Sequence, residues 1–241
     1  MAINRLVVPS IVVGLSAIIA AVVLAIGFGN IKVSAETMNA TGSAKKVIVS
    51  DLGILRINLT AEGATAAEAY RALVAQRPAL LAYLEKKGIS ANKINYQTIN
   101  NFPNYSFGAN GQQLGVRNYN ASQMIDFQST DVNLIKEISL DVSSLVESGI
   151  SLNVNPPEYY YTKLSDIKIE IQAEAAKDAM ERGRRVAEAT GRKLGALKSA
   201  RMGVLQITPE NSNMTSDYGI NDVSSIRKEI TAVVSANFEI E

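Results

Sequence analysis

An uncharged apolar run over residues 6–28 constrains this chain more than any other feature of its sequence. About twenty consecutive apolar residues are enough to cross a bilayer as a single helix. Arg5 precedes the run and Lys32 follows it, and positive charge on both sides gives only a weak orientation signal. Because the α-amine adds to the charge of Arg5, we expect the N-terminus on the inner side of the membrane and the folded domain on the outer side.

The same N-terminal segment has a second interpretation, as a cleaved signal peptide. The small residues Val-Ser-Ala at 33–35 would then form the cleavage site. However, the apolar stretch is longer than the usual core of a signal peptide, and Lys32 lies within the cleavage region. We therefore expect residues 1–35 to form an uncleaved membrane anchor with its linker, and residues 36–241 to form the folded part.

The chain contains no cysteine and no histidine, which excludes several classes of functional site. Thiolate nucleophiles, disulfides, Ser-His-Asp triads and the usual zinc sites all require one of these residues. With 24 Lys and Arg against 23 Asp and Glu, there is also no basic excess of the kind that indicates nucleic-acid binding. We therefore expect no metal, no cofactor, no nucleic-acid partner and no enzymatic activity.

Beyond residue 37 the sequence alternates between strand and helix patterns. Residues 46–49 and 54–60 favour strands, and the turn-forming residues 50–53 between them predict a hairpin. Further strands are expected at 94–99, 119–127, 150–154, 202–207 and 230–240.

The first helix of the folded part is predicted between residues 65 and 87. Thr65 followed by Glu68 forms a capping box at its start. Pro78 should kink this helix or split it in two. Gly88, with Ile89 after it, is typical of a Schellman ending.

Two more helices are predicted further along the chain. Asp131 is placed to cap the first of them, which should end at Gly149. The other spans 164–190 and carries small and apolar residues at helical spacing. The resulting order, ββα–ββα–βα–ββ, indicates an α+β fold with helices packed on mostly antiparallel sheets.

Short segments in this order and spacing resemble the SIMPL-domain proteins of bacterial envelopes. The matching segments are 40–43, 66–69, 87–89, 119–123, 175–179, 187–191, 194–195 and 233–240. Residues 159–164 and 206–209 are most similar to the membrane-anchored branch of the family. The resemblance implies a SIMPL-like fold anchored in the inner membrane, with the domain on the periplasmic side. It further implies no established catalytic site, ring assembly in some members, and links to oxidative or envelope stress in others.

Aromatic side chains gather in two segments that could contact a partner. The first set is Phe102, Tyr105, Phe107 and Tyr119, which flank a Gly- and Asn-rich hairpin tip. The second set is Tyr159, Tyr160 and Tyr161, which are consecutive in an extended segment and cannot all face one core. Both sets could fold onto their own domain, line a ligand groove, or lie at a subunit interface, where aromatic residues are enriched. We expect a homo-oligomer with these residues at the contact.

The densest basic region lies in the second half of the longest helix and just beyond it. It consists of Lys177, Arg182, Arg184, Arg185, Arg192 and Lys193. These side chains could contact anionic lipid headgroups, a polyanion or an acidic neighbouring subunit. Alternatively, they form a solvated face favoured by the dipole near a helix C-terminus.

These observations favour a non-enzymatic, membrane-anchored envelope protein that self-assembles as a scaffold or interaction module, linked to envelope or oxidative stress. An alternative is a periplasmic module that binds a small molecule or peptide through the aromatic hairpin. A hydrolase based on carboxylates or a Ser–Lys pair is the third alternative. It is disfavoured because the acidic residues Asp126, Asp131, Asp141 and Glu147 match no pattern of fixed ligand spacing.

Overall fold

The computed structural model describes the backbone of residues 4–29 and 36–241, and the side chains of residues 11–24 and 36–241. The N-terminal segment contains one helix, α1 (Asn4–Gly29). Among the residues whose side chains are described, which include only 11–24 of α1, no helix is long and apolar enough to span a membrane. The expected cleavage site at 33–35 and Lys32 lie outside the described residues, so the membrane anchor stays a prediction.

The remainder of the chain forms an α+β fold with mostly antiparallel sheets, as predicted. Its helices are α2 (Ala66–Lys86), α3 (Val132–Asp141) and α4 (Leu164–Ala189), with short 3-10 turns η1 (Ala91–Lys93) and η2 (Val142–Ser148). Its strands are β1 (Thr37–Val49), β2 (Leu52–Gly63), β3 (Ile94–Tyr96), β4 (Asn100–Phe107), β5 (Gln113–Ser129), β6 (Leu152–Val154), β7 (Glu158–Tyr160), β8 (Leu194–Met202), β9 (Gln206–Pro209), β10 (Ile220–Asn221) and β11 (Arg227–Ile240). The order therefore contains more strands than the predicted ββα–ββα–βα–ββ, because short or exposed strands carry little periodic pattern.

The described residues divide into two compact units. Of the described residues, the small unit comprises 4–29, 36–41, 179–201 and 235–241, and the large unit comprises 42–178 and 202–234. This division interrupts the segment 36–241 that the sequence suggested as one domain.

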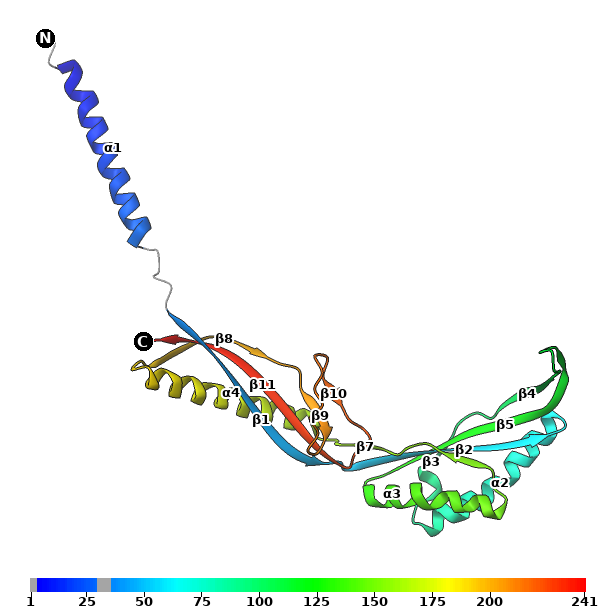
Figure 1. Cartoon of the computed structure of the whole chain (residues 1–241). Helices are drawn as coiled ribbons and strands as arrows, with labels where there is room; N and C mark the ends of the chain where they lie inside the picture. Colours follow the sequence, from blue (N-terminus) through cyan, green and yellow to red (C-terminus); the bar gives the residue numbers. More distant parts are fainter. Residues whose placement is uncertain (1–3, 30–35) are drawn as a thin grey trace. The chain divides into compact units, whose positions relative to one another are not determined.

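The main layer of the large unit is a six-stranded sheet covered on one face by α2 and α3 (Figure 1). Its strand order is β3-β5-β2-β6, with β4 also paired to β5 and β7 also paired to β2. Strands β2 and β5 pair antiparallel along their length, from Gly53↔Ser129 to Gly63↔Tyr119. Alternate residues of β2 are buried, as period-two alternation in a one-sided sheet requires.

Helix α2 begins and ends as its sequence predicts, but it does not break at its proline. The Thr65 side chain accepts a hydrogen bond from the Glu68 N–H at 3.2 Å, and the Glu68 carboxylate accepts one from the Thr65 N–H at 3.3 Å, which completes the capping box. Gly88 has φ of 93°, and the Ile89 N–H donates to the Leu84 carbonyl at 2.9 Å in a Schellman ending. Pro78 lies inside one continuous helix, so the predicted split is wrong. The apolar stripe of α2 packs on the sheet on both sides of the proline, and this tertiary packing offsets the missing hydrogen bond.

The predicted hairpin over 46–60 is also wrong, because its two strands belong to different sheets. Strand β1 pairs with β11 in a five-stranded sheet of order β1-β11-β9-β10, with β8 also paired to β11, whereas β2 pairs with β5. Between them, the Ser50 N–H donates to the Ile226 carbonyl at 2.8 Å and the Asp51 N–H donates to the Tyr160 carbonyl at 2.9 Å. Alternation identifies a strand but not its partner, and here each strand finds its partner far along the chain.

The small unit packs small side chains closely. Its apolar cluster consists of Ala40, Ala179, Ala236 and Phe238, with Leu194 packed against them. The predicted strand at 202–207 is misplaced, since β8 starts at Leu194 and the next strand, β9, begins at Gln206. Strand β8 is exposed over most of its length, so it lacks the burial pattern on which the prediction depended.

Candidate functional site

The hairpin formed by β4 and β5 carries the most exposed group of aromatic side chains predicted to form a contact. The two strands pair from Asn100↔Ser122 to Phe107↔Gln113, with irregularities after Asn104 and after Ser106. Such irregularities bend and twist a strand pair. At the tip, the Gly108 N–H donates to the Gln112 carbonyl at 2.8 Å. The hairpin is therefore a regular, hydrogen-bonded element.

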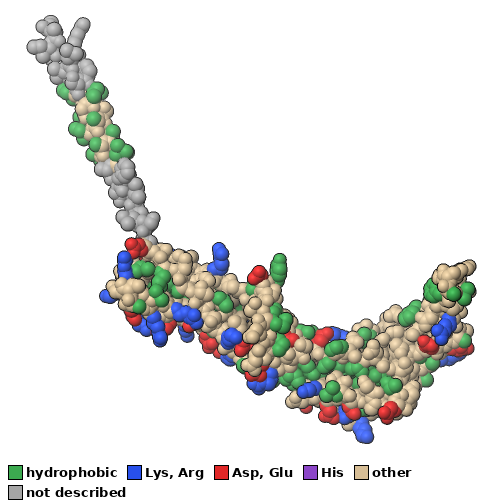
Figure 2. Space-filling model, in the orientation of Figure 1, with side chains coloured by type: hydrophobic (Ala, Val, Ile, Leu, Met, Phe, Trp, Pro, Cys, Tyr) green, Lys and Arg blue, Asp and Glu red, His purple; other side chains and the backbone are tan. Residues whose placement is uncertain are grey.

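Five apolar side chains of this hairpin are exposed. They are Phe102 (46%), Tyr105 (44%), Phe107 (64%), Leu114 (67%) and Val116 (46%), which we call the hairpin patch. Figure 2 shows hydrophobic side chains near the end of this hairpin. Tyr105 and Val116 are cross-strand partners, so their side chains lie on the same face. Leu114 and Val116 were not predicted as contact residues, because the prediction for this segment depended on its aromatic residues alone.

Tyr119 pairs with Pro103, next to the pair formed by Phe102 and Asn120, but it has a different role from the patch. It is partly buried and packs against the core beneath the sheet. Next to it along the chain, the Asn118 amide donates to the Glu62 carboxylate at 2.7 Å and accepts from the Asn104 amide at 2.9 Å. Tyr119 and these polar contacts therefore join the hairpin to the rest of the large unit, whereas the patch side chains stay exposed.

The tyrosine segment 159–161 is used mainly inside its own chain. Tyr159 is only 3% exposed and belongs to the core of the large unit, so its ring offers no surface to a partner. The Tyr160 hydroxyl donates to the Glu158 carboxylate at 2.6 Å, and Glu158 also pairs with Arg56. The Arg56 guanidinium lowers the pKa of Glu158 below its usual range. Tyr161 is partly buried against a second apolar cluster of the large unit, which includes Ile48, Ile171 and Ile230.

The basic region of α4 is largely balanced by acids close to it. Arg184 pairs with Glu181 and with Glu188, each at 2.8 Å, and Arg185 also pairs with Glu181 at 2.8 Å. Hydrogen bonds from Arg184 and then Arg185 lower the pKa of Glu181 to about 2. Beyond the helix, Arg192 pairs with Glu36 at 2.5 Å. This arrangement is typical of a solvated helix face whose opposite charges pair along the helix, and not of a concentrated cationic surface. Contact of this basic region with an anionic partner stays a prediction.

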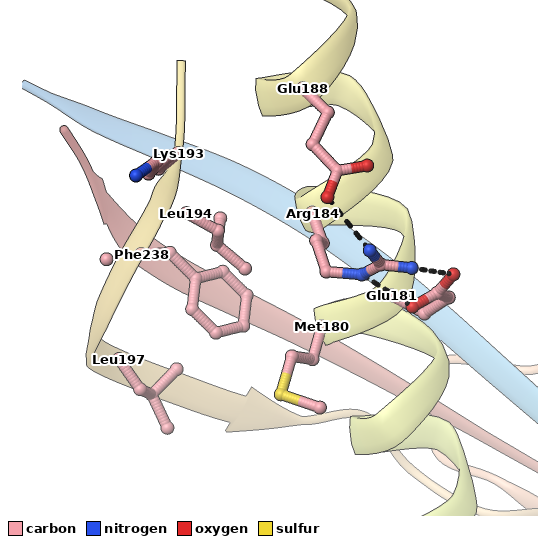
Figure 3. Close-up of a pocket in the computed structure, with 9 residues that line it drawn as sticks. Met180, Glu181, Arg184, Glu188, Lys193, Leu194, Leu197 and Phe238 are labelled. Atoms are coloured by element: carbon pink, nitrogen blue, oxygen red, sulfur yellow. Dashed lines mark hydrogen bonds and ion pairs between the residues drawn. The ribbon is translucent and has the colours of Figure 1, made fainter.

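An open cleft of about 440 Å³ lies beside these arginines in the small unit. Figure 3 shows Phe238, Leu194 and Leu197 on the strand side and Met180 on α4, with Arg184 held between Glu181 and Glu188. The charged residues of its lining are Glu181, Glu188, Arg184 and Lys193, so the cleft presents a mainly apolar floor and a rim whose formal charges cancel. It contains no arrangement of nucleophile and base that would support catalysis.

A buried lysine is the functional candidate that the sequence analysis missed. Lys228 is 2% exposed, and its ammonium group donates to the carbonyls of Tyr159, at 2.6 Å, and Asp222. Burial lowers its pKa, and the nearby Asp222 acts in the opposite direction. Nothing in the strand pattern of 227–240 distinguishes this lysine from an exposed one, because its partners lie in distant segments. The contacts favour a structural role that ties β7 to β11.

Three of the four acidic residues considered for catalysis, Asp126, Asp131 and Asp141, accept hydrogen bonds within the chain. Asp131 accepts from the N–H groups of Asn133 and Leu134, each at 3.0 Å, and thereby caps α3. Asp141 accepts from the Tyr83 hydroxyl at 2.9 Å and pairs with Lys87 at 3.0 Å. Within the described part of the chain, no three carboxylates are close enough to hold a metal ion together.

Comparison with known proteins identifies one family. The family described as "SIMPL: Protein of unknown function (DUF541)" matches residues 38–238. No curated protein matches the sequence significantly. Among solved structures, one match is a candidate amidohydrolase/peptidase from Burkholderia cenocepacia, with 13% identity and a TM-score of 0.24. That match covers 51% of this chain and 29% of the other chain, so this protein spans less than a third of it. A likeness at this level supports no conclusion about fold or activity.

Proposed function

This chain belongs to the SIMPL family of proteins of unknown function, and on that premise we propose that it is a non-enzymatic, membrane-anchored envelope protein that assembles with copies of itself. The hairpin patch is the observation that carries the proposal. Five apolar side chains, each at least 44% exposed, lie on one projecting strand pair. Contiguous apolar surface of this kind is typical of protein interaction sites.

The patch favours assembly over ligand capture. Aromatic and large aliphatic side chains contribute most to interface cores, where each buried large side chain is worth about 1.5–3 kcal/mol. A second copy of the chain would present the same apolar surface, and symmetry would repeat the contact in every subunit. The scaffold or interaction role, with its link to envelope or oxidative stress, rests on the family resemblance.

The membrane anchor is supported by the length of the N-terminal helix. Helix α1 has 26 residues, which corresponds to about 39 Å at the α-helical rise, and the hydrocarbon core of a bilayer is about 30 Å thick. We place the folded part on the periplasmic side of the inner membrane, from the flanking charges and the family resemblance. Intact mass of the membrane-extracted protein tests the anchor. A chain that retains residues 1–35 supports it, and a chain that begins at Glu36 means that the segment is a signal peptide.

Assembly is tested by the mass of the full chain in detergent, measured by size-exclusion chromatography with light scattering. We expect an oligomer, and we expect the triple variant Phe102→Ser, Tyr105→Ser, Phe107→Ser to be smaller while keeping its circular dichroism spectrum. A matched triple variant, Tyr70→Ser, Leu140→Ser, Ile169→Ser, removes three exposed apolar side chains from helices instead and should keep the wild-type mass. A monomeric wild-type protein at micromolar concentration would refute assembly. An oligomer that survives the hairpin variant would refute this contact.

A further inference from the structure

The tip of the β4–β5 hairpin holds the only Asn-Gly dipeptide of the chain, Asn110–Gly111. Both residues are exposed, and Gly111 has φ of 77°, in the left-handed region that favours glycine. Every other asparagine is followed by a residue whose side chain shields the next backbone nitrogen. Gly111 has no side chain, and no described atom lies within 4 Å of the place that its Cβ would take. The Gly111 nitrogen is therefore open to attack on a neighbouring electrophile.

The carboxamide of Asn110 is folded back toward that nitrogen. The Gln112 N–H donates to Asn110 Oδ1 at 3.3 Å, two residues further along the chain. Such an Asx turn bends the side chain over the backbone that follows it, which here begins with the Gly111 nitrogen. The same hydrogen bond draws electrons from Asn110 Cγ and makes this carbon a better electrophile. Nucleophile and electrophile are thus adjacent, as closure of a succinimide ring requires.

One hydrogen bond opposes the ring closure. The Gly111 N–H donates to the Gly108 carbonyl at 2.9 Å, so this bond must open before the nitrogen can lose its proton. The bond belongs to an exposed hairpin tip, and exposed tips open locally at a small cost in free energy. It therefore slows the attack without preventing it.

We propose that Asn110 deamidates spontaneously and that the resulting negative charge weakens self-association through the hairpin patch. The Gly111 nitrogen forms a bond to Asn110 Cγ, the Cγ–Nδ2 bond breaks, and ammonia leaves with the proton from Gly111. Water then opens the succinimide at either carbonyl and gives aspartate or isoaspartate. The net reaction consumes one water, releases one ammonia and needs no oxidant. The chemical step is independent of assembly, whereas its effect on the patch rests on the proposed function.

Asn110 lies next to the hairpin patch. A Cβ atom at Gly108 would lie 3.2 Å from Asn110 Oδ1 and 3.6 Å from Leu114 Cδ2, so the carboxamide and this patch side chain border the same space. Residues 94–116 contain no charged side chain, so a carboxylate at position 110 introduces the first charge of the hairpin tip. Burying a charge beside an apolar contact is costly, and symmetry repeats that cost in every subunit.

Peptide mapping by mass spectrometry, with fragmentation that distinguishes isoaspartate from aspartate, tests the chemical step on the full chain in detergent. We expect Asn110 to deamidate at least tenfold faster than any other asparagine, and faster as the pH rises, because the Gly111 nitrogen must lose its proton. The triple serine variant of the hairpin patch keeps the tip and should react whether or not the wild type assembles. Asn110→Gln should lack the modification at this peptide, and the matched variant Asn211→Gln should retain it. An unmodified Asn110 in both the wild type and the triple variant would refute the chemical step.

The variant Asn110→Asp tests the effect of the charge, by size-exclusion chromatography with light scattering over a dilution series. We expect its dissociation constant to be about tenfold higher than that of the wild type, which corresponds to about 1.4 kcal/mol. Asn211→Asp is the matched control, because it adds the same charge at an exposed residue outside the hairpin and should assemble like the wild type. Equal dissociation constants for the two aspartate variants would refute the effect on assembly. A monomeric wild type would refute the assembly itself, and the mass of the peptide that contains residue 110 would still decide the chemical step.

Discussion

The large unit and the small unit are stabilised by different kinds of side chain. In the large unit, fully buried leucines and isoleucines such as Leu55, Ile57 and Leu73 join the sheet to its helices. In the small unit, alanines such as Ala179 and Ala236 occupy the equivalent position between helix and strands. Large side chains stabilise through the apolar area that they bury, whereas small ones let backbones approach closely.

Gly183 shows how little space the small unit leaves beside α4. A Cβ atom at this position would lie 3.3 Å from a Leu194 methyl carbon, 3.3 Å from the Met38 methyl carbon and 3.4 Å from Ala40 Cβ. We therefore expect the large unit to be most sensitive to loss of volume, and the small unit to gain of volume or charge. Four substitutions test this comparison.

The largest effect is expected for Ala179→Asp in the small unit. Ala179 is fully buried, so the variant would place an unpaired carboxylate in the closely packed contact between α4 and the strands. We expect this to lower the free energy of unfolding by about 4 kcal/mol. Urea unfolding of the full chain measures it. Ala173→Asp, at an exposed position of the same helix, is the control. Equal midpoints for the two variants would show that the buried face of α4 is assigned wrongly.

Leu73→Ala should have the next largest effect, in the large unit. Leu73 is fully buried, and truncation would leave a cavity that lowers the free energy of unfolding by about 3 kcal/mol. Leu140→Ala changes the same residue type at a position that is 75% exposed, and should leave the stability nearly unchanged. A loss below about 1 kcal/mol for Leu73→Ala would mean that this core collapses easily around small side chains.

Gly183→Val should destabilise the small unit although it adds apolar volume. The added methyl groups would clash with the Leu194, Met38 and Ala40 side chains, and overpacking of this kind costs about 2 kcal/mol. The control is Ala173→Val, which adds volume at an exposed site of the helix. A Gly183→Val protein as stable as the wild type would contradict the close packing inferred between α4 and the strands of the small unit.

The smallest effect is expected for Glu181→Gln, and it should depend on pH. The folded-state pKa of Glu181 is about 2, below its ordinary value of 4.5, because Arg184 and Arg185 favour the charged form. Its contribution to stability is therefore fully present above about pH 4.5 and is lost as the pH falls toward 2. Between about pH 5 and 2 the wild type should lose stability more steeply than Glu181→Gln. Parallel pH profiles for the two proteins would contradict the ion pairs, and added salt should reduce the difference.

Local features of the fold were predictable because their hydrogen bonds join residues a few positions apart. The capping box of Thr65 and Glu68, the Asp131 cap and the Gly88 ending were all confirmed. The long helix was also placed correctly, to within one residue at its end. The sequence likewise identified the aromatic hairpin segment, since residue type and alternation are visible without a structure.

Long-range features were decided only by the tertiary structure. The separation of β1 from β2, the continuity of α2 through Pro78 and the burial of Tyr159 all depend on partners distant in the chain. The pairing of β9 with β11, which sets Thr208 opposite Glu229, likewise forms only when the sheet forms. A sequence pattern records which face of an element is apolar, but pairing is determined by which distant surfaces bury each other, and that choice exists only in the folded chain.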